Sequence, residues 1–195
     1  FVKEDSHPMK SLMKFIILGS CCLYPISLNA KACSEKNKEL AVNQDFTAQK
    51  NGTIKHHPSG LEFKQCLEGQ SVSAHGCKGT AQSFSWLEAD SHAKAHLHNS
   101  KQDWRLPKIE ELQILLTYTC NQTTVDKTLF PSLTTEQIWS ASPGAPVNDH
   151  SVVLNVSDGA IYGVGRGVKR QVLLVRGKPS REWLEQEPPS DWVIR

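Results

Sequence analysis

The N-terminal 32 residues constrain this chain most, because they decide in which compartment the rest must fold. Lysines precede an apolar run, Phe15–Leu23, and the segment ends in Ala30-Lys31-Ala32. These three parts are typical of a secretory signal peptide, and the apolar run is too short to cross a membrane. We therefore predict that residues 1–32 are a signal peptide with upstream residues, with Met9 or Met13 as the translation start. The protein is then exported to the periplasm, the cell surface or the medium.

A lipoprotein signal is the alternative interpretation of the same segment. Leu18-Gly19-Ser20 precedes Cys21, and acylation of that cysteine would anchor the protein to a membrane. The apolar stretch before Cys21 is short, and Ala30-Lys31-Ala32 is the better cleavage site. A membrane is therefore expected as a partner only if Cys21 is acylated.

Four of the six cysteines lie in the exported part, and an even number there predicts two disulfides. Cys66 and Cys77 flank a loop rich in Gly and Ser, which favours a local bridge between them. Cys33 and Cys120 would then form the second bridge. The sequence alone leaves all three pairings open. No cysteine or histidine spacing is typical of zinc, so no metal is expected.

The net charge falls when the signal segment is removed. The whole chain carries a formal net charge of +2, but residues 1–32 contain four lysines and two acids. The exported part then has 18 basic and 18 acidic residues. This balance argues against a uniformly basic surface, and nucleic acid is not an expected partner. A chain of 195 residues, 38% of them hydrophobic, is long enough for one domain with a core.

Hydrophobic periodicity predicts an α+β domain that begins with a β-hairpin. Residues 53–55 and 61–66 alternate apolar and polar side chains around a turn at 56–60. Both turn histidines, His56 and His57, are expected to be solvated. Residues 33–50 are expected to form an irregular N-terminal arm, and residues 67–82 a loop.

Two helices are predicted next. Ser83 is the expected N-cap of the first, and Pro107 is typical of the first turn of the second. Spacing of three and four residues defines the inward face of each helix. These faces consist of Trp86, Ala89, Ala93 and Leu97 in the first helix, and of Ile109, Leu112, Leu115 and Leu116 in the second.

An antiparallel meander is predicted after the helices, which completes the α+β plan. Its strands are residues 137–141, 152–156, 160–164 and 171–176, and residues 163–167 are interpreted as a flexible loop. Residues 178–195 are expected to be a C-terminal tail that packs through Trp183 and Trp192 or stays loose.

An ordered set of short motifs resembles the Lcl C-terminal domain family. The most distinctive is Asp103-Trp104-Arg105-Leu106-Pro107, followed by Glu111-Leu112. The resemblance covers about residues 51–177. Further motifs on both sides of it occur in the family's order: Asn51-Gly52-Thr53, Ser59-Gly60-Leu61, Phe63-Lys64-Gln65-Cys66, Trp86-Leu87-Glu88-Ala89, Trp139-Ser140-Ala141-Ser142-Pro143 and Val172-Leu173-Leu174-Val175-Arg176.

The resemblance implies a C-type-lectin-like α+β fold, with two helices packed on a short antiparallel β-sheet, in an exported bacterial protein. It also implies a binding module without enzymatic activity, and no cofactor is expected. The adhesin that gives the family its name binds sulfated glycans such as glycosaminoglycans. A structural or assembly component of the bacterial cell envelope, which binds a protein partner, stays open as the alternative.

The candidate ligand site is a local basic stretch. Residues 158–178 contain five cations and one acid, a local net charge of +4. Guanidinium groups bind sulfate or carboxylate groups in a bidentate way, so this stretch favours an anionic glycan. A solvated fringe on an edge strand is the alternative interpretation. The expected ligand-binding residues are Arg166, Lys169, Arg170 and Arg176.

Two other motifs favour structural interpretations. Trp104 precedes a helix and is expected in the core, and Arg105 is expected to pair with an acid or to support a loop. His92 and His96, four residues apart on the first helix, could ligate a metal at its edge. No H-E-x-x-H motif is present, so we expect surface histidines that titrate near neutral pH.

Overall fold

The structure is a computed structural model that describes residues 45–185, with gaps at 101–102, 119–122, 135–136 and 145–148. The expected signal peptide, Cys33, Cys120 and Trp192 therefore lie outside the described residues. No helix in the described part is long and apolar enough to span a membrane.

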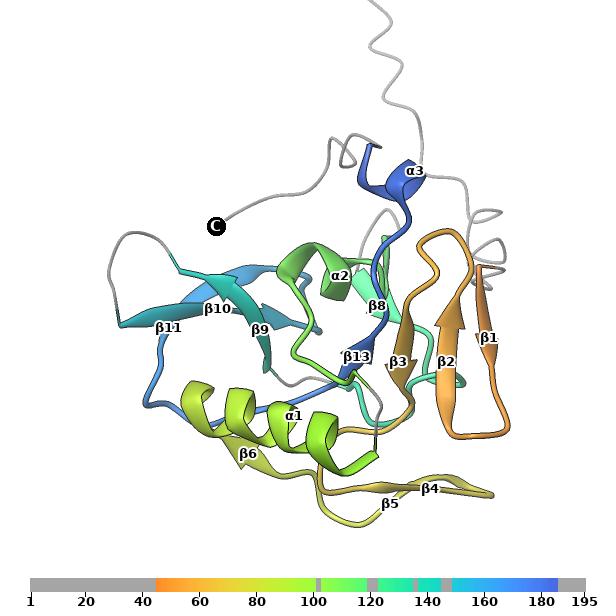
Figure 1. Ribbon diagram of the computed structural model, residues 1–195, viewed down its shortest axis with the longest axis horizontal. Coiled ribbons are helices and arrows are strands. Elements are labelled where there is room, and N and C mark those ends of the chain that lie inside the picture. The colour runs from red at the N-terminus through yellow and green to blue at the C-terminus, as the bar shows by residue number, and fades with distance from the viewer. Residues whose placement is uncertain (1–44, 101–102, 119–122, 135–136, 145–148, 186–195) are drawn as a thin grey trace, which may run out of the picture. The chain divides into compact units, whose positions relative to one another are not determined.

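The described chain is a mixed α+β domain with two larger sheets. Figure 1 shows β1–β3 on one side of β13 and β9–β11 on the other. The four-stranded sheet has the order β1 (Phe46–Ala48), β2 (Thr53–His56), β3 (Glu62–Lys64), β13 (Val175–Arg176). The five-stranded sheet has the order β11 (Ile161–Gly165), β10 (His150–Asn155), β9 (Gln137–Pro143), β12 (Arg170–Gln171), β6 (Ser83–Phe84).

Two hairpins and three helices complete the described elements. The helices are α1 (Trp86–Ser100), α2 (Ile109–Gln113) and α3 (Arg181–Leu184), so one is long and two are short. The hairpins are β4 (Ser71–Ser73) with β5 (Gly76–Lys78), and β7 (Leu116–Tyr118) with β8 (Thr123–Val125).

The predicted N-terminal hairpin is confirmed. Strand β2 pairs antiparallel with β3, and Ile54 lies opposite Phe63. Gly60 has a φ of 75° in the turn, a backbone conformation that favours glycine. The prediction of an irregular arm at residues 33–50 is wrong near the end of that segment, because residues 46–48 form β1, which pairs with β2. Burial of Phe46 in the core anchors this added strand.

The loop expected at residues 67–82 contains the β4–β5 hairpin. A disulfide joins Cys66 to Cys77, whose Cα atoms are 5.6 Å apart. Because Cys77 lies in β5 and Cys66 follows β3, the bridge attaches this small hairpin to the four-stranded sheet. Position 76 has a φ of 105°, which explains the glycine there.

Ser85, rather than Ser83, caps α1. The Ser85 hydroxyl accepts a hydrogen bond from the Glu88 amide, and the Glu88 carboxylate accepts one from the Ser85 amide. This reciprocal pair is a capping box, whereas Ser83 lies in β6. Ala89 and Ala93 are buried as predicted, Trp86 is half-buried, and the side chain of Leu97 is outside the described part.

The second helix is shorter than predicted. It ends at Gln113, and Leu116 begins β7. The apolar run at 114–116 fits a buried strand as well as a helix by periodicity alone, which explains the error. Leu112, Leu115 and Leu116 are nevertheless buried, as their expected inward positions require.

The last predicted strand divides into two short strands that belong to different sheets. Strand β12 pairs in parallel with β9, which corrects the expected all-antiparallel meander, and β13 pairs antiparallel with β3. Residues 172–174, which lie between the two strands, and Val175, which begins β13, are all completely buried. Successive side chains of an extended chain point to opposite sides, so one segment supplies two cores.

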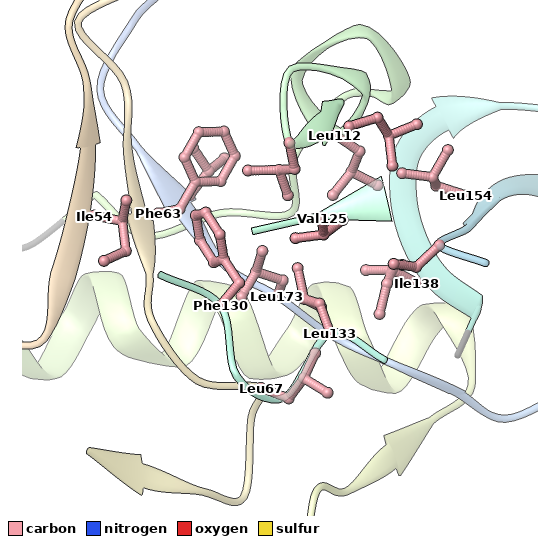
Figure 2. Packing of buried hydrophobic residues seen from close by; sticks show 14 of the residues in the cluster. Ile54, Phe63, Leu67, Leu112, Val125, Phe130, Leu133, Ile138, Leu154 and Leu173 are labelled. Atoms are coloured by element: carbon pink, nitrogen blue, oxygen red, sulfur yellow. The ribbon is translucent and has the colours of Figure 1, made fainter. Parts of the chain in front are cut away.

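These two cores share that segment. Leu173 and Val175 belong to the larger one, where Phe63 and Phe130 pack edge to face (Figure 2). Val172 and Leu174 belong to the smaller one, beside α1 and the five-stranded sheet. The smaller core consists of Ala89, Ala93, Trp104, Leu106, Trp139, Val153, Val172 and Leu174.

Candidate functional site

The Trp104-Arg105 motif is structural, as predicted. Trp104 is buried, with the Arg176 guanidinium 5.0 Å and the Lys64 ammonium 5.5 Å from its ring centroid. Arg105 donates from its two terminal nitrogens to the two carboxylate oxygens of Glu111, at 2.7 Å each. It also donates to the Gly177 carbonyl. The motif therefore joins the start of α2 to the end of β13.

Three of the four predicted ligand-binding residues lie in one loop. We call residues 166–170, which comprise the turn after β11 and the first residue of β12, the basic loop. Its cations are Arg166, Lys169 and Arg170. Arg170 lies opposite Phe84 in the β12–β6 pair, and its Nε donates to Gln137 at 2.6 Å. The five-stranded sheet thus holds the end of this loop in place.

Trp86 at the start of α1 supports the basic loop. The Arg166 guanidinium lies 4.5 Å from the Trp86 ring centroid, within cation–π distance. The Trp86 amide donates to the Arg166 carbonyl, and its indole donates to Ser140. Arg166 Nε also donates to the Ser151 hydroxyl at 3.1 Å. Arg166 is therefore positioned before any ligand arrives.

Lys169 is exposed, and one carboxylate carries the opposite charge nearby. The Ser85 amide and hydroxyl lower the pKa of Glu88, and the charge of Lys169 contributes to this lowering. Glu88 is held at the N-terminus of its own helix by those Ser85 hydrogen bonds. The loop retains its net positive charge.

Arg176 lies apart from the basic loop, in the four-stranded sheet. Its guanidinium pairs with the Glu62 carboxylate, which lies opposite it on β3. Its position over Trp104 gives it a second structural contact. Arg176 thus makes its described contacts in the four-stranded sheet, whereas Arg166, Lys169 and Arg170 follow β11.

A second cluster joins α1 to the loop after β3. His92 Nε2 lies 2.6 Å and His96 Nε2 lies 3.4 Å from Oε2 of Glu68. Lys64 donates to the other carboxylate oxygen at 2.7 Å. The spacing of the two histidines indicated a possible metal edge in the sequence, but it did not indicate Glu68. No local motif could have revealed it, because it lies 24 residues before His92.

Comparison with known families now identifies the domain. Residues 52–176 match the Lcl C-terminal domain. This chain belongs to the Lcl C-terminal domain family. A search of curated proteins finds no match. Lcl C-terminal domains occur in bacterial surface and collagen-like proteins and are generally non-catalytic modules. Together with the disulfide, this membership indicates an extracytoplasmic protein.

One turn histidine of this Lcl C-terminal domain is buried, which corrects the expected solvation. His56 is buried at the end of β2, and its Nδ1 lies 2.8 Å from the Ser59 hydroxyl. Its ring also packs against Phe46. Burial lowers the pKa of His56 to about 4, so the ring is neutral at pH 7. His57 is exposed, as expected.

This burial predicts acid sensitivity. The unfolded chain takes up a proton at His56 near pH 6.5, whereas the folded domain does so only near pH 4. Stability is therefore fully present above pH 6.5 and is lost as the pH falls from 6.5 to 4. Between pH 7.5 and pH 5, this group should remove about 2 kcal/mol from the free energy of unfolding.

Urea denaturation at several pH values measures this loss. His56→Gln removes the titrating group, so its stability should fall by about 2 kcal/mol less than the wild type over that interval. His75→Gln, at an exposed histidine in the β4–β5 turn, is the matched control and should keep the wild-type pH dependence. Equal pH dependence in the His56 variant and the wild type would refute the assignment.

Proposed function

We propose that this domain is an exported, non-catalytic binding module of the C-type-lectin-like type that binds anionic, sulfated glycans in adhesion through its basic loop. The observation that carries the proposal is the arrangement of Arg166, Lys169 and Arg170 beside Trp86. Such a module acts in the periplasm, at the cell surface or in the medium.

The chemistry of these side chains suits sulfate and carboxylate groups. A guanidinium donates two parallel hydrogen bonds to such a group, and an ammonium adds a point charge. Arg166 is held by Trp86 and Ser151, so binding costs little of its side-chain entropy. Because Lys169 is exposed and Arg166 and Arg170 are partly exposed, the attraction should weaken with added salt.

Two exposed apolar side chains favour a second candidate, an envelope protein partner. Leu87 follows Trp86 and is 64% exposed, and Val168 precedes Lys169 and is 41% exposed. Contact with a protein would cover these side chains. Association through them would persist at high salt, which distinguishes it from glycan binding.

Neutralising the basic loop tests the glycan proposal. The triple variant Arg166→Gln, Lys169→Gln, Arg170→Gln should bind immobilised heparin at least ~tenfold more weakly, since three charge-assisted contacts are lost. A matched variant removes the same charge from exposed lysines elsewhere: Lys50→Gln, Lys78→Gln, Lys127→Gln. It should bind within about twofold of wild type. Equal loss in both variants would mean that net charge, rather than the basic loop, governs binding.

A further inference from the structure

We propose that Glu68, His92 and His96 form a binding site for a divalent transition-metal ion of the zinc class. This site is independent of the basic loop and of glycan binding. The site combines His92 and His96 of α1 with Glu68 of the loop between β3 and β4. Glu68 lies 24 residues before His92 in the sequence.

The distances fit one ion. The ligand atoms of the three side chains all lie within 4.8 Å of one another. Tetrahedral zinc with bonds of about 2.0–2.1 Å places its ligand atoms roughly 3.3 Å apart. Oε2 of Glu68 lies 2.6 Å from Nε2 of His92 and 3.4 Å from Nε2 of His96. Small side-chain movements are therefore enough to admit an ion.

The carboxylate is held so that one oxygen faces both imidazoles. Lys64 binds Oε1 of Glu68, which leaves Oε2 directed at His92 and His96. The Glu68 backbone is fixed as well: its amide donates to the Val172 carbonyl, and its carbonyl accepts from the Gln82 amide. The ligand oxygen therefore comes from a rigid part of the domain.

The two imidazoles are ordered by the helix and by an aromatic neighbour. His92 and His96 are four residues apart in α1, so they lie on one face of the helix. Phe84 stacks on the His92 ring with 4.9 Å between centroids and 28° between planes. The His96 ring meets the His92 ring edge to face at 5.0 Å.

The negative charge of Glu68 also favours a metal. Burial would raise the pKa of Glu68, but hydrogen bonds and charge from Lys64 and His92 outweigh it and hold the pKa below its usual value. Glu68 is therefore a carboxylate at neutral pH.

The donor set selects the class of ion. Two imidazole nitrogens with one carboxylate oxygen suit zinc, whereas calcium and magnesium prefer oxygen ligands throughout. Three protein ligands leave a fourth position for water. The side chains of His92 and His96 are each 33% exposed, so an ion can enter from solvent, while Glu68 is nearly covered at 7%.

Isothermal titration of the full chain with zinc chloride at pH 7.5, without a histidine tag, tests the proposal. We expect one equivalent to bind and each of His92→Gln and His96→Gln to weaken binding at least ~tenfold. His75→Gln, at an exposed histidine in the β4–β5 turn, should bind like wild type.

Circular dichroism of each variant tests whether it folds, and the partial exposure of both histidines favours folding. Absence of stoichiometric zinc binding to the wild type would overturn the proposal. Wild-type affinity in both the His92 and the His96 variant would also overturn it, because zinc would then bind elsewhere. Failure of zinc binding leaves the glycan proposal intact, since none of these residues lies in the basic loop.

Discussion

Trp139→Ala is expected to lower the free energy of unfolding by about 3–5 kcal/mol, the largest effect of any substitution considered. Trp139 is completely buried in β9, in the smaller core, so truncation leaves a large cavity. Its indole also donates a 2.8 Å hydrogen bond to the Phe84 carbonyl, which links β9 to the edge strand β6. Both contributions disappear together in the alanine variant.

Urea denaturation measures this effect, and a second variant separates its two parts. Trp139→Phe retains most of the apolar volume but loses the indole donor and leaves the Phe84 carbonyl without that bond. It should cost about 1–3 kcal/mol, less than the alanine variant. A loss below about 1 kcal/mol for Trp139→Ala would show that the smaller core can close over the cavity.

Arg105→Ala should cost about 3 kcal/mol, because it leaves the Glu111 carboxylate buried without its partner. The Glu111 side chain is 2% exposed, and the Arg105 side chain is 36% exposed. The partial exposure of Arg105 places the expected cost at the lower end of the range for buried pairs. The variant also loses the Arg105 hydrogen bond to Gly177, which holds the end of β13.

A double variant tests whether the isolated charge causes the loss. Arg105→Met with Glu111→Leu removes both charges and keeps apolar volume, so it should be more stable than Arg105→Ala alone. Urea denaturation of the two variants at pH 7 gives the comparison. If the double variant is less stable than Arg105→Ala, then the backbone hydrogen bonds of this pair matter more than its charges.

Local patterns predicted those parts of the fold that local chemistry determines. Alternation around a glycine turn gave the β2–β3 hairpin, and spacing of three and four residues gave the buried face of α1. The position of Trp104 before a helix and the chemistry of Arg105 were also sufficient to predict their structural contacts.

Long-range pairing explains what the sequence could not predict. The apolar segment 172–175 was expected to form one strand, but its alternating side chains fill two cores, and its ends pair with β9 and β3. The burial of His56 could not be predicted from the sequence, because it depends on the packing of β1. Local periodicity did not reveal that strand.

The candidate sites show the same division. Arg166, Lys169 and Arg170 lie close together in the chain, so the local excess of positive charge in the sequence was enough to predict that they share one site. The contact between Arg166 and Trp86 did not, since these residues are 80 positions apart and meet only through the folded sheet. Glu68 escaped prediction for the same reason.

Mapping of a sulfated heparin oligosaccharide by ¹H–¹⁵N NMR tests the central claim most directly. We predict that the largest shift changes occur at the amides of residues 166–170 and at the Trp86 indole, and that added salt removes them. Changes centred on Arg176, on another face of the domain or nowhere at all would contradict glycan binding by the basic loop.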